Sequence, residues 1–399
     1  MANESLILNP NSRQVGSMLG YKPVPQETNP NAVLPVEVSF TRNSVGMEKR
    51  SDGLWHQVPV NMPRRYWDGT KYSWLFEPQA TNINIGANGF GWNGTGIVTG
   101  NFGLSPQGTT NAFRVQIGSG QYERCPTFTM LASTTYTVSS FIKNNGTAVG
   151  QNVRFYVNNN SGVNPLTVFA NVDINNLTAT VGTVTGATNV SVSIRIESNG
   201  YLFVALTFTS NASTGSAVTE LGFDSIGNTF DILAWGTQFE TGSVATSPII
   251  TAGSAVTRVV DNYSRALSAM NQGSAIVKIP DNIIVGGIGT HVFGIFILAG
   301  TGIGIYLSRI ANGRNRLWTQ AATTIFQTTV DDLKLGITWN GTSISVWQNG
   351  VKVVTDFSFA LTGVVNLLNS ANLETPNLID EIILYNTVLS DVEMGDLTQ

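Results

Sequence analysis

Carboxylates are the first side chains to examine, because two of them across a cleft can share acid and base chemistry. Cleavage of a glycosidic bond needs two carboxyl groups about 5 to 10 Å apart. Glu220 and Asp224 lie four residues apart, but the segment that holds them resembles the end of a strand. Asp380 and Glu381 are adjacent, so on one strand their side chains point to opposite faces. Structural roles suit these acids better, and we expect no catalytic residue and no enzyme activity.

Other groups that carry chemistry are scarce. The chain has one cysteine, Cys125, and two histidines, His56 and His291, and none belongs to a recognisable nucleophile motif. The glycine-rich stretches 286–289 and 300–304 precede no expected helix. They therefore lack the helix N-terminus on which a dinucleotide phosphate binds. We expect no cofactor.

Calcium is the metal that the acids could hold, since it binds carboxylate and carbonyl oxygens. Asp331-Asp332 and Asp380 are the acidic candidates, but no loop spacing typical of a calcium site surrounds them. A single cysteine excludes an internal disulfide and a cysteine-based zinc site. No metal site is predicted.

Tryptophan and arginine side chains in the last third of the chain are the candidates for ligand binding. Trp347 lies on the opposite strand face from Ile344 and Val346, and Trp318 follows two arginines. Such side chains could stack on a sugar ring and hydrogen-bond to its hydroxyl groups. Core or inter-subunit packing is the alternative, and the commoner role. The candidate carbohydrate-binding residues are Arg314, Arg316, Trp318 and Trp347.

Strands are the elements that must position these residues. Only 12% of the 399 residues are charged, about half the usual share, and 41 are glycine. We predict an all-β fold: tandem antiparallel β-sandwiches of jelly-roll type after an extended N-terminal arm. The net charge of −4 argues against nucleic-acid binding.

Signals for secretion or membrane insertion are not visible. The N-terminus has no basic region followed by an apolar run. No stretch approaches the roughly 20 apolar residues that cross a bilayer. We expect a soluble protein that is made in a cytoplasm and does not insert into membranes.

Residues 1–35 are expected to form an extended arm. Proline breaks helices, and four prolines stand among polar residues here: Pro10, Pro23, Pro25 and Pro30. One interpretation is a segment that anchors the protein by becoming ordered on a neighbouring protein. The alternative is a disordered leader.

Residues 36–81 are expected to form a small aromatic-rich β segment. Their sequence includes the runs Phe40-Thr41-Arg42-Asn43-Ser44, Ser51-Asp52-Gly53-Leu54, Asn61-Met62-Pro63-Arg64 and Leu75-Phe76-Glu77-Pro78-Gln79-Ala80-Thr81-Asn82. These runs resemble a lead-in that many bacteriophage structural proteins place before a β-sandwich. The aromatic residues of the segment are Trp55, Tyr66, Trp67, Tyr72 and Trp74.

Residues 82–265 are expected to form the first sandwich. Val204, Leu206 and Phe208 alternate after Asn199-Gly200, a dipeptide that favours a two-residue hairpin. Near the end of this region, Leu233, Trp235 and Phe239 are predicted to share one strand face. The run Trp235-Gly236-Thr237-Gln238-Phe239-Glu240 leads to Thr246-Ser247, Thr257-Arg258 and Asp261. It resembles the closing strand of carbohydrate-binding-module-like sandwiches in phage virion proteins.

Residues 266–399 are expected to form the second sandwich. Asn340-Gly341 and Asn349-Gly350 separate alternating segments and predict a three-stranded meander. Ser390 and Glu393 have the spacing of a capping box, which predicts a helix start. The meander and the run from Leu378 to Glu393 resemble laminin-G-like, concanavalin-type domains.

Together these resemblances imply a bacteriophage virion structural protein, a head or tail fibre or a decoration protein. They imply attachment to capsid or tail proteins through the arm, a homotrimer, and sandwich modules that adhere to host-surface glycans. The expected location is the virion. The alternative function is a virion-associated enzyme that degrades polysaccharide.

Overall fold

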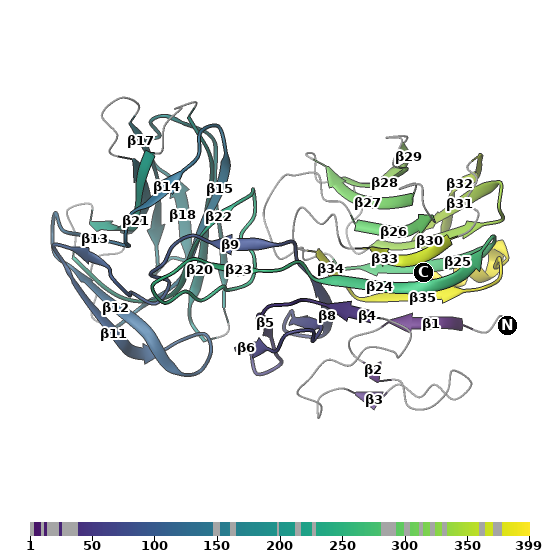
Figure 1. Ribbon diagram of the computed structural model, residues 1–399, viewed down its shortest axis with the longest axis horizontal. Coiled ribbons are helices and arrows are strands. Elements are labelled where there is room, and N and C mark those ends of the chain that lie inside the picture. Colours follow the sequence, from purple (N-terminus) through teal and green to yellow (C-terminus); the bar gives the residue numbers. More distant parts are fainter. Residues whose placement is uncertain are drawn as a thin grey trace. The chain divides into compact units, whose positions relative to one another are not determined.

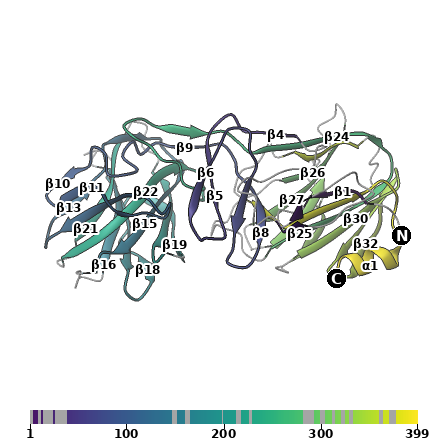
Figure 2. The same ribbon diagram turned by 90° about the horizontal axis from the view of Figure 1, so that it is seen from below.

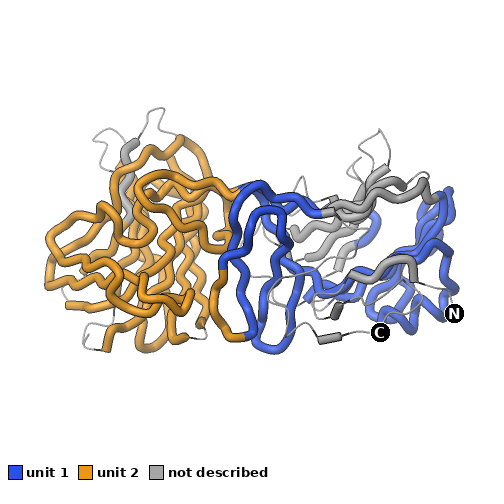
Figure 3. The backbone as a smooth tube through the Cα atoms, turned by 60° about the horizontal axis from the view of Figure 1, so that its bottom comes forward, with its two compact units in different colours: residues 1–51, 57–79, 259–399 blue, residues 52–56, 80–258 orange. Residues whose placement is uncertain are grey.

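The computed structural model groups the chain into two compact units (Figure 3). Unit 1 comprises Met1–Ser51, Gln57–Gln79 and Val259–Gln399, and unit 2 comprises Asp52–His56 and Ala80–Arg258. The structure describes residues 4–8, 12–13, 24–25, 39–146, 152–159, 165–197, 199–211, 217–225, 229–280, 293–298, 304–310, 314–319, 324–328, 333–358, 364–369 and 377–399.

Unit 2 is a β-sandwich of two antiparallel sheets (Figure 1). The six-stranded sheet has the order β11 (Ile97–Leu104), β12 (Thr110–Ile117), β22 (Phe230–Thr241), β15 (Thr135–Asn144), β20 (Leu202–Ser210), β19 (Ala187–Ile196). The seven-stranded sheet has the order β10 (Asn93–Gly94), β13 (Tyr122–Arg124), β21 (Ala217–Ser225), β16 (Asn152–Asn159), β17 (Leu166–Asp173), β18 (Thr178–Val181), and β14 (Phe128–Met130) also pairs with β21. The short strands β9 (Ala80–Asn82) and β23 (Val256–Arg258) pair with each other.

The core of unit 2 lies between its two sheets. Inward-facing side chains of both sheets form one cluster, which includes Phe113, Val138 and Phe208 from the six-stranded sheet and Phe155 and Val168 from the seven-stranded sheet. The predicted pairing of these strands is present: β19 pairs with β20, and Gly200 adopts a φ of 79° in the turn. The connection is longer than the predicted two-residue turn, because the Glu197 amide donates to the Tyr201 carbonyl and the Gly200 amide to the Glu197 carbonyl. Alternation along these strands therefore places one face in the core, as the sequence predicts.

The strand β22 departs from the predicted alternation. Gly236 adopts a φ of 61°, and the pairing of β22 with β15 shifts register between Ser139 and Phe141. The bulge moves later side chains to the other face of the strand. Phe239 therefore joins the core between the sheets, whereas Trp235 packs against Phe141 outside that core. The prediction that these two residues share a face is wrong.

Unit 1 also contains two large antiparallel sheets. One has the order β1 (Glu4–Leu8), β35 (Glu381–Tyr385), β25 (Gly273–Ile279), β30 (Leu333–Trp339), β31 (Ser343–Gln348), β32 (Val351–Ser358). The other has the order β29 (Thr324–Thr328), β28 (Arg314–Thr319), β27 (Gly304–Ile310), β26 (Phe293–Leu298), β33 (Val364–Asn369), β24 (Asn262–Met270), β4 (Ser39–Thr41). The predicted meander corresponds to β30, β31 and β32.

The strands of the aromatic segment pair with one another and with a strand near the C-terminus. A five-stranded sheet has the order β34 (Asn377–Ile379), β8 (Tyr72–Phe76), β7 (Arg64–Trp67), β5 (Gly46–Lys49), β6 (Trp55–Val58). Strand β8 thus pairs with β34 from the other end of the chain. Trp74, Phe76 and Tyr263 lie in one core with the strands of the β25–β30 sheet. The predicted boundaries follow the order of the chain, whereas these pairings join segments about 300 residues apart.

The expected N-terminal arm contributes a strand to unit 1. Strand β1 pairs with β35 antiparallel, and Leu8 lies opposite Ile382. Strands β2 (Ser12–Arg13) and β3 (Val24–Pro25) pair with each other. A truncation that removes the arm therefore also removes a sheet strand, which the sequence did not predict.

The helix α1 (Asp391–Leu397) begins at the predicted capping box (Figure 2). It is the one helix among the described residues. Met394 of α1 packs with Trp347, Ile276 and Tyr385. The all-β fold class with tandem antiparallel sandwiches is confirmed.

Candidate functional site

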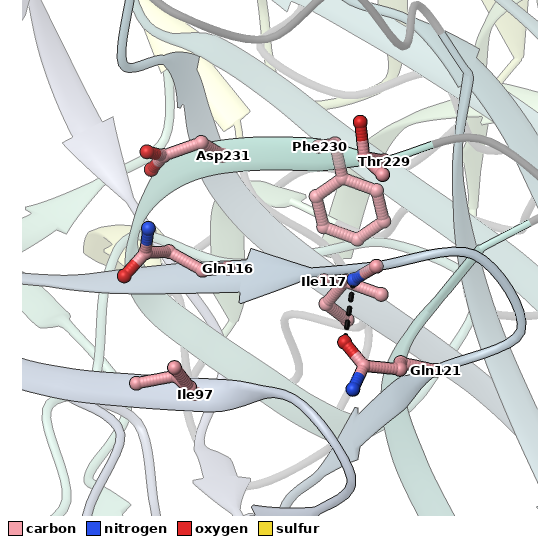
Figure 4. Close-up of a pocket in the computed structure, with 8 residues that line it drawn as sticks. Ile97, Gln116, Ile117, Gln121, Thr229, Phe230 and Asp231 are labelled. Atoms are coloured by element: carbon pink, nitrogen blue, oxygen red, sulfur yellow. Dashed lines mark hydrogen bonds between the residues drawn. The ribbon is translucent and has the colours of Figure 1, made fainter.

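An open pocket of about 330 Å³ lies in unit 2, at one end of its six-stranded sheet (Figure 4). Strand β12 ends here, and β11 and β22 begin here. The lining residues are Ile97, Gln116, Ile117, Gly118, Gln121, Thr229, Phe230 and Asp231.

Three of these side chains form a row across neighbouring strands. Gln116 of β12 pairs with Ile97 of β11 on one side and with Asp231 of β22 on the other. Ile97 is 60% exposed, so the row has an apolar end open to solvent. Strand pairing therefore places an apolar group, an amide and a carboxylate in a row, each about 5 Å from the next along the sheet.

The carboxylate of Asp231 is held in place by its neighbours. Arg114 Nε donates to Asp231 Oδ1 at 2.9 Å, and Arg114 Nη2 donates to Oδ2. Asn145 Nδ2 also donates to Oδ1, at 3.1 Å. The guanidinium of Arg114 lies 4.6 Å from the centre of the Phe102 ring. The hydrogen bond to Asp231 raises the pKa of Arg114, so this cation stays charged.

Gln121 and Gln116 differ in how their side chains are held by hydrogen bonds. Gln121 Oε1 accepts from the Gly118 amide at 2.6 Å, and its Nε2 donates to the Thr95 carbonyl at 2.7 Å. Within the described residues, the side chains of Gln116 and Thr229 make no hydrogen bond. An amide and a hydroxyl can each donate and accept. The pocket thus offers these two groups, one carboxylate and an apolar wall to a small hydroxylated ligand.

The structure separates the predicted carbohydrate-binding residues. Trp347 lies on β31 and is only 2% exposed, with Leu389 and Met394 packed around it. Its ring therefore forms part of the core, the role that the sequence analysis set against sugar stacking. Arg314, Arg316 and Trp318 lie on β28, in the other large sheet of unit 1. Their side chains lie outside the described part of the structure, so sugar binding by these three stays a prediction.

The other candidates from the sequence are hydrogen-bonded, buried or outside the described residues. Asp380 accepts from Lys71 at 2.5 Å and from the Ser73 hydroxyl at 2.6 Å. Asp224 accepts from Arg154 at 3.1 Å. Cys125 is buried. Asp331-Asp332, His291 and the two glycine-rich stretches fall wholly or mostly outside the described residues.

No group of three or more histidine, cysteine or acidic residues in the described part of the chain could hold a metal ion. No helix there has the length and hydropathy needed to span a membrane.

Residues of the lead-in and Asp261 from the closing run form a buried ionic cluster in unit 1. Asp261 Oδ1 accepts from Arg42 Nη1 at 3.0 Å and from Arg64 Nε at 3.3 Å. Arg64 Nη1 lies 2.6 Å from Glu77 Oε2, and the Glu77 amide donates to Asp261 Oδ2 at 3.0 Å. All four residues are at most 1% exposed. The cluster is therefore a structural tie and not an open site.

The pKa values of the two arginines diverge within this cluster. Burial and the positive charge of Arg64 lower the pKa of Arg42. Burial acts in the same direction on Arg64, but the carboxylates of Asp261 and Glu77 outweigh it and raise the pKa of Arg64. Burial also raises the pKa of the neighbouring Tyr263 hydroxyl.

The closing-strand residues form a second buried network, in unit 2. Glu240 accepts from the Thr246 amide at 3.0 Å, from the Thr246 hydroxyl at 2.5 Å and from Gln238 Nε2 at 3.0 Å. Arg258 Nη1 donates to Thr246 Oγ1 and Ser247 Oγ, each at 3.1 Å. The residues that carry the phage resemblance thus hold the fold together.

The pocket was not predicted from the sequence. The strand from Ala112 to Ile117 shows outward-facing Arg114 and Gln116 between buried residues, which is the available local signal. Nothing in the sequence shows that Asp231 lies beside Gln116, because 115 residues separate them.

Neither a family model nor a curated protein matches the chain. Among solved structures, domain 4 of AbnA, a GH43 extracellular arabinanase from Geobacillus stearothermophilus, is 16% identical, with 40% of this chain and 82% of that chain covered and a TM-score of 0.26. Trypanosoma rangeli sialidase in complex with sialic acid is 10% identical, with 90% and 83% covered and a TM-score of 0.26. The same sialidase without a named ligand is 10% identical, with 94% and 95% covered and a TM-score of 0.26.

These similarities contradict the expectation that the chain is not an enzyme, because the similar proteins are named as a sialidase and as part of an arabinanase. That expectation is withdrawn. At a TM-score of 0.26, no residue role or substrate is transferred from these proteins to this chain.

Proposed function

We propose that this chain is a glycan-directed protein of a bacteriophage particle, and that the unit 2 pocket holds a sugar residue. One observation carries the proposal: the unpaired Gln116 amide stands between exposed Ile97 and oriented Asp231 in an open pocket. Sugar rings present hydroxyl groups at their edges and C–H groups on their faces. An amide, a carboxylate and an aliphatic wall match both kinds of surface.

The phage assignment is supported by the two sequence runs that form the buried networks. Arg42, Arg64 and Asp261 tie unit 1 together, and Glu240 and Arg258 do so in unit 2. Residues with such specific partners constrain a sequence strongly, which accounts for a spaced motif without a catalytic role. A head or tail fibre or decoration protein, attached by its N-terminal residues, remains our proposal for the particle.

Polysaccharide degradation on the particle is the second candidate. Its support is Asp231, a carboxylate oriented by Arg114 inside an open pocket. Glycosidases use such a group as nucleophile or base, together with a second carboxyl group as acid, which the eight lining residues do not include. Release of reducing sugar from host polysaccharide during incubation with the protein supports cleavage. Stable binding without release supports adhesion alone.

The proposed homotrimer also rests on the phage resemblance. A mass near three times the 42.7 kDa of one chain is expected from light scattering. A mass near 42.7 kDa contradicts the trimer and leaves the pocket proposal untouched.

Glycan binding is tested by retention of the full chain on immobilised host-surface polysaccharide. Gln116→Ala removes the free amide and is expected to weaken retention at least tenfold. Gln57→Ala is the control, because Gln57 is an exposed strand glutamine outside the pocket. Equal retention of both variants and the unmodified chain contradicts the assignment of the pocket.

A further inference from the structure

We infer that the unit 2 pocket selects an uncharged sugar and rejects a sugar acid such as a sialic or uronic acid. This inference rests on the proposed function and specifies its ligand class. It concerns the same eight lining residues.

The charges around the pocket carry the argument. Asp231 is the one ionisable group among the lining residues, and no lysine or arginine lines the pocket. A carboxylate on the ligand would therefore find no cation among the lining residues, and it would lie beside the Asp231 carboxylate, whose counter-charge is already Arg114.

Arg114 is the nearest cation, and its contacts keep it from serving the ligand. Two of its nitrogens donate to Asp231, and its guanidinium packs against the Phe102 ring. A sugar acid would need this bidentate geometry for itself. Binding it would break the pair with Asp231 and leave that carboxylate without its counter-charge.

A neutral sugar meets no such conflict. Its hydroxyl groups can hydrogen-bond with the side chains of Gln116 and Thr229, each of which can donate and accept. Its C–H face can lie on Ile97, which is 60% exposed. The volume of about 330 Å³ is at the small end for ligand pockets, which suits a single sugar residue.

The test compares the full chain on immobilised neutral and acidic glycans. The neutral probes are glucan, galactan and N-acetylglucosamine oligomers, and the acidic probes are polysialic acid and polygalacturonate. We expect binding to at least one neutral probe, with acidic probes at least tenfold weaker. Gln116→Ala should abolish the neutral binding.

Asp231→Asn tests the charge argument directly. It removes the carboxylate and releases Arg114 from its pair, so acidic probes should gain at least threefold while neutral binding falls. Asp224→Asn is the matched control, since Asp224 also pairs with an arginine in unit 2 but lies outside the pocket. Gln116→Lys, which leaves the Asp231 pair in place, should likewise favour acidic probes. If thermal melting shows that Asp231→Asn is unfolded, Gln116→Lys takes its place in the test.

The outcomes distinguish failure of the charge selectivity from failure of the proposed function. Acidic-glycan binding by the unmodified chain that Gln116→Ala abolishes overturns the selectivity and leaves the proposed function standing. Binding of acidic glycans that is the same in Asp231→Asn and Gln116→Lys as in the unmodified chain also overturns the selectivity. Binding to neither kind of probe overturns the proposed function itself.

Discussion

At the scale of single residues, the sequence motifs and the candidate site fall on different side chains. Arg42, Arg64 and Asp261 carry the resemblance to phage proteins, and all three are fully buried in an ionic cluster. Gln116 and Asp231 line an open pocket and belong to no motif. A recognisable spacing here marks residues that maintain the fold.

The first prediction concerns Asp261, which accepts hydrogen bonds from both buried arginines. Asp261→Asn keeps the shape but leaves two guanidinium groups with one carboxylate. Removing one partner of a buried ion pair costs about 3 to 5 kcal/mol. Urea unfolding should show a fall of this size in the free energy of unfolding of unit 1. Asp396→Asn, at an exposed position of the same unit, should change it by less than about 0.5 kcal/mol.

The second prediction concerns the pH dependence that Glu123 causes. Burial raises the pKa of Glu123, and the Gly96 amide offsets this only in part. The unfolded chain loses this proton near pH 4.3, whereas the folded chain keeps it to higher pH. Stability therefore falls as the pH rises from about 4 through the folded pKa.

In Glu123→Gln the side chain cannot ionise, so the loss of stability at higher pH disappears. Urea unfolding should show a higher free energy of unfolding for the variant than for the unmodified chain at pH 7, and no such gain at pH 3. A gain of the same size at both pH values would mean that ionisation of Glu123 is not the cause.

At the scale of elements, α1 is the piece that turns Trp347 into a core residue. Ser390 caps the helix: its hydroxyl accepts from the Glu393 amide at 3.3 Å, and its amide donates to Glu393 Oε2 at 2.9 Å. These hydrogen bonds from Ser390 lower the pKa of Glu393. The stability that ionised Glu393 adds to the helix cap is therefore fully present above about pH 4.5. It is lost as the pH falls through the lowered pKa of Glu393.

The third prediction follows for Ser390→Ala. Loss of an N-cap costs about 1 kcal/mol, so thermal unfolding at pH 7 should show this loss for unit 1. The loss should become smaller as the pH falls through the lowered pKa of Glu393. Ser390→Thr keeps a capping hydroxyl and should stay close to the unmodified chain; if it loses as much as Ser390→Ala, capping is not the reason.

At the scale of the whole molecule, the chain builds two cores. Leu335 lies in the core of unit 1 and Phe208 in the core of unit 2, and both are fully buried. Each unit is large enough to unfold as a cooperative domain. The division interrupts the sequence, since residues 52–56 belong to unit 2 and the segments on either side belong to unit 1.

The fourth prediction is that calorimetry of the full chain resolves two transitions. Leu335→Ala and Phe208→Ala should each cost about 2 to 5 kcal/mol. Each substitution should lower the transition of its own unit and leave the other unchanged. One common transition that moves with both substitutions contradicts two independent cores.

The sequence by itself determined the local structure of this protein. Alternation of apolar residues and the dipeptides Asn199-Gly200 and Asn349-Gly350 predicted the hairpins that the structure contains. The spacing of Ser390 and Glu393 predicted the start of α1. These features depend on residues within a few positions of one another, and short-range sterics and hydrogen bonds are encoded there.

The tertiary structure alone decided the rest. A bulge at Gly236 moved Phe239 to the face opposite Trp235, and α1 covered Trp347. Strand pairing across 115 residues brought Asp231 beside Gln116 and so created the pocket. Local periodicity contains no information about which distant strand becomes the neighbour, because register and pairing are set by how both sheets bury their faces together.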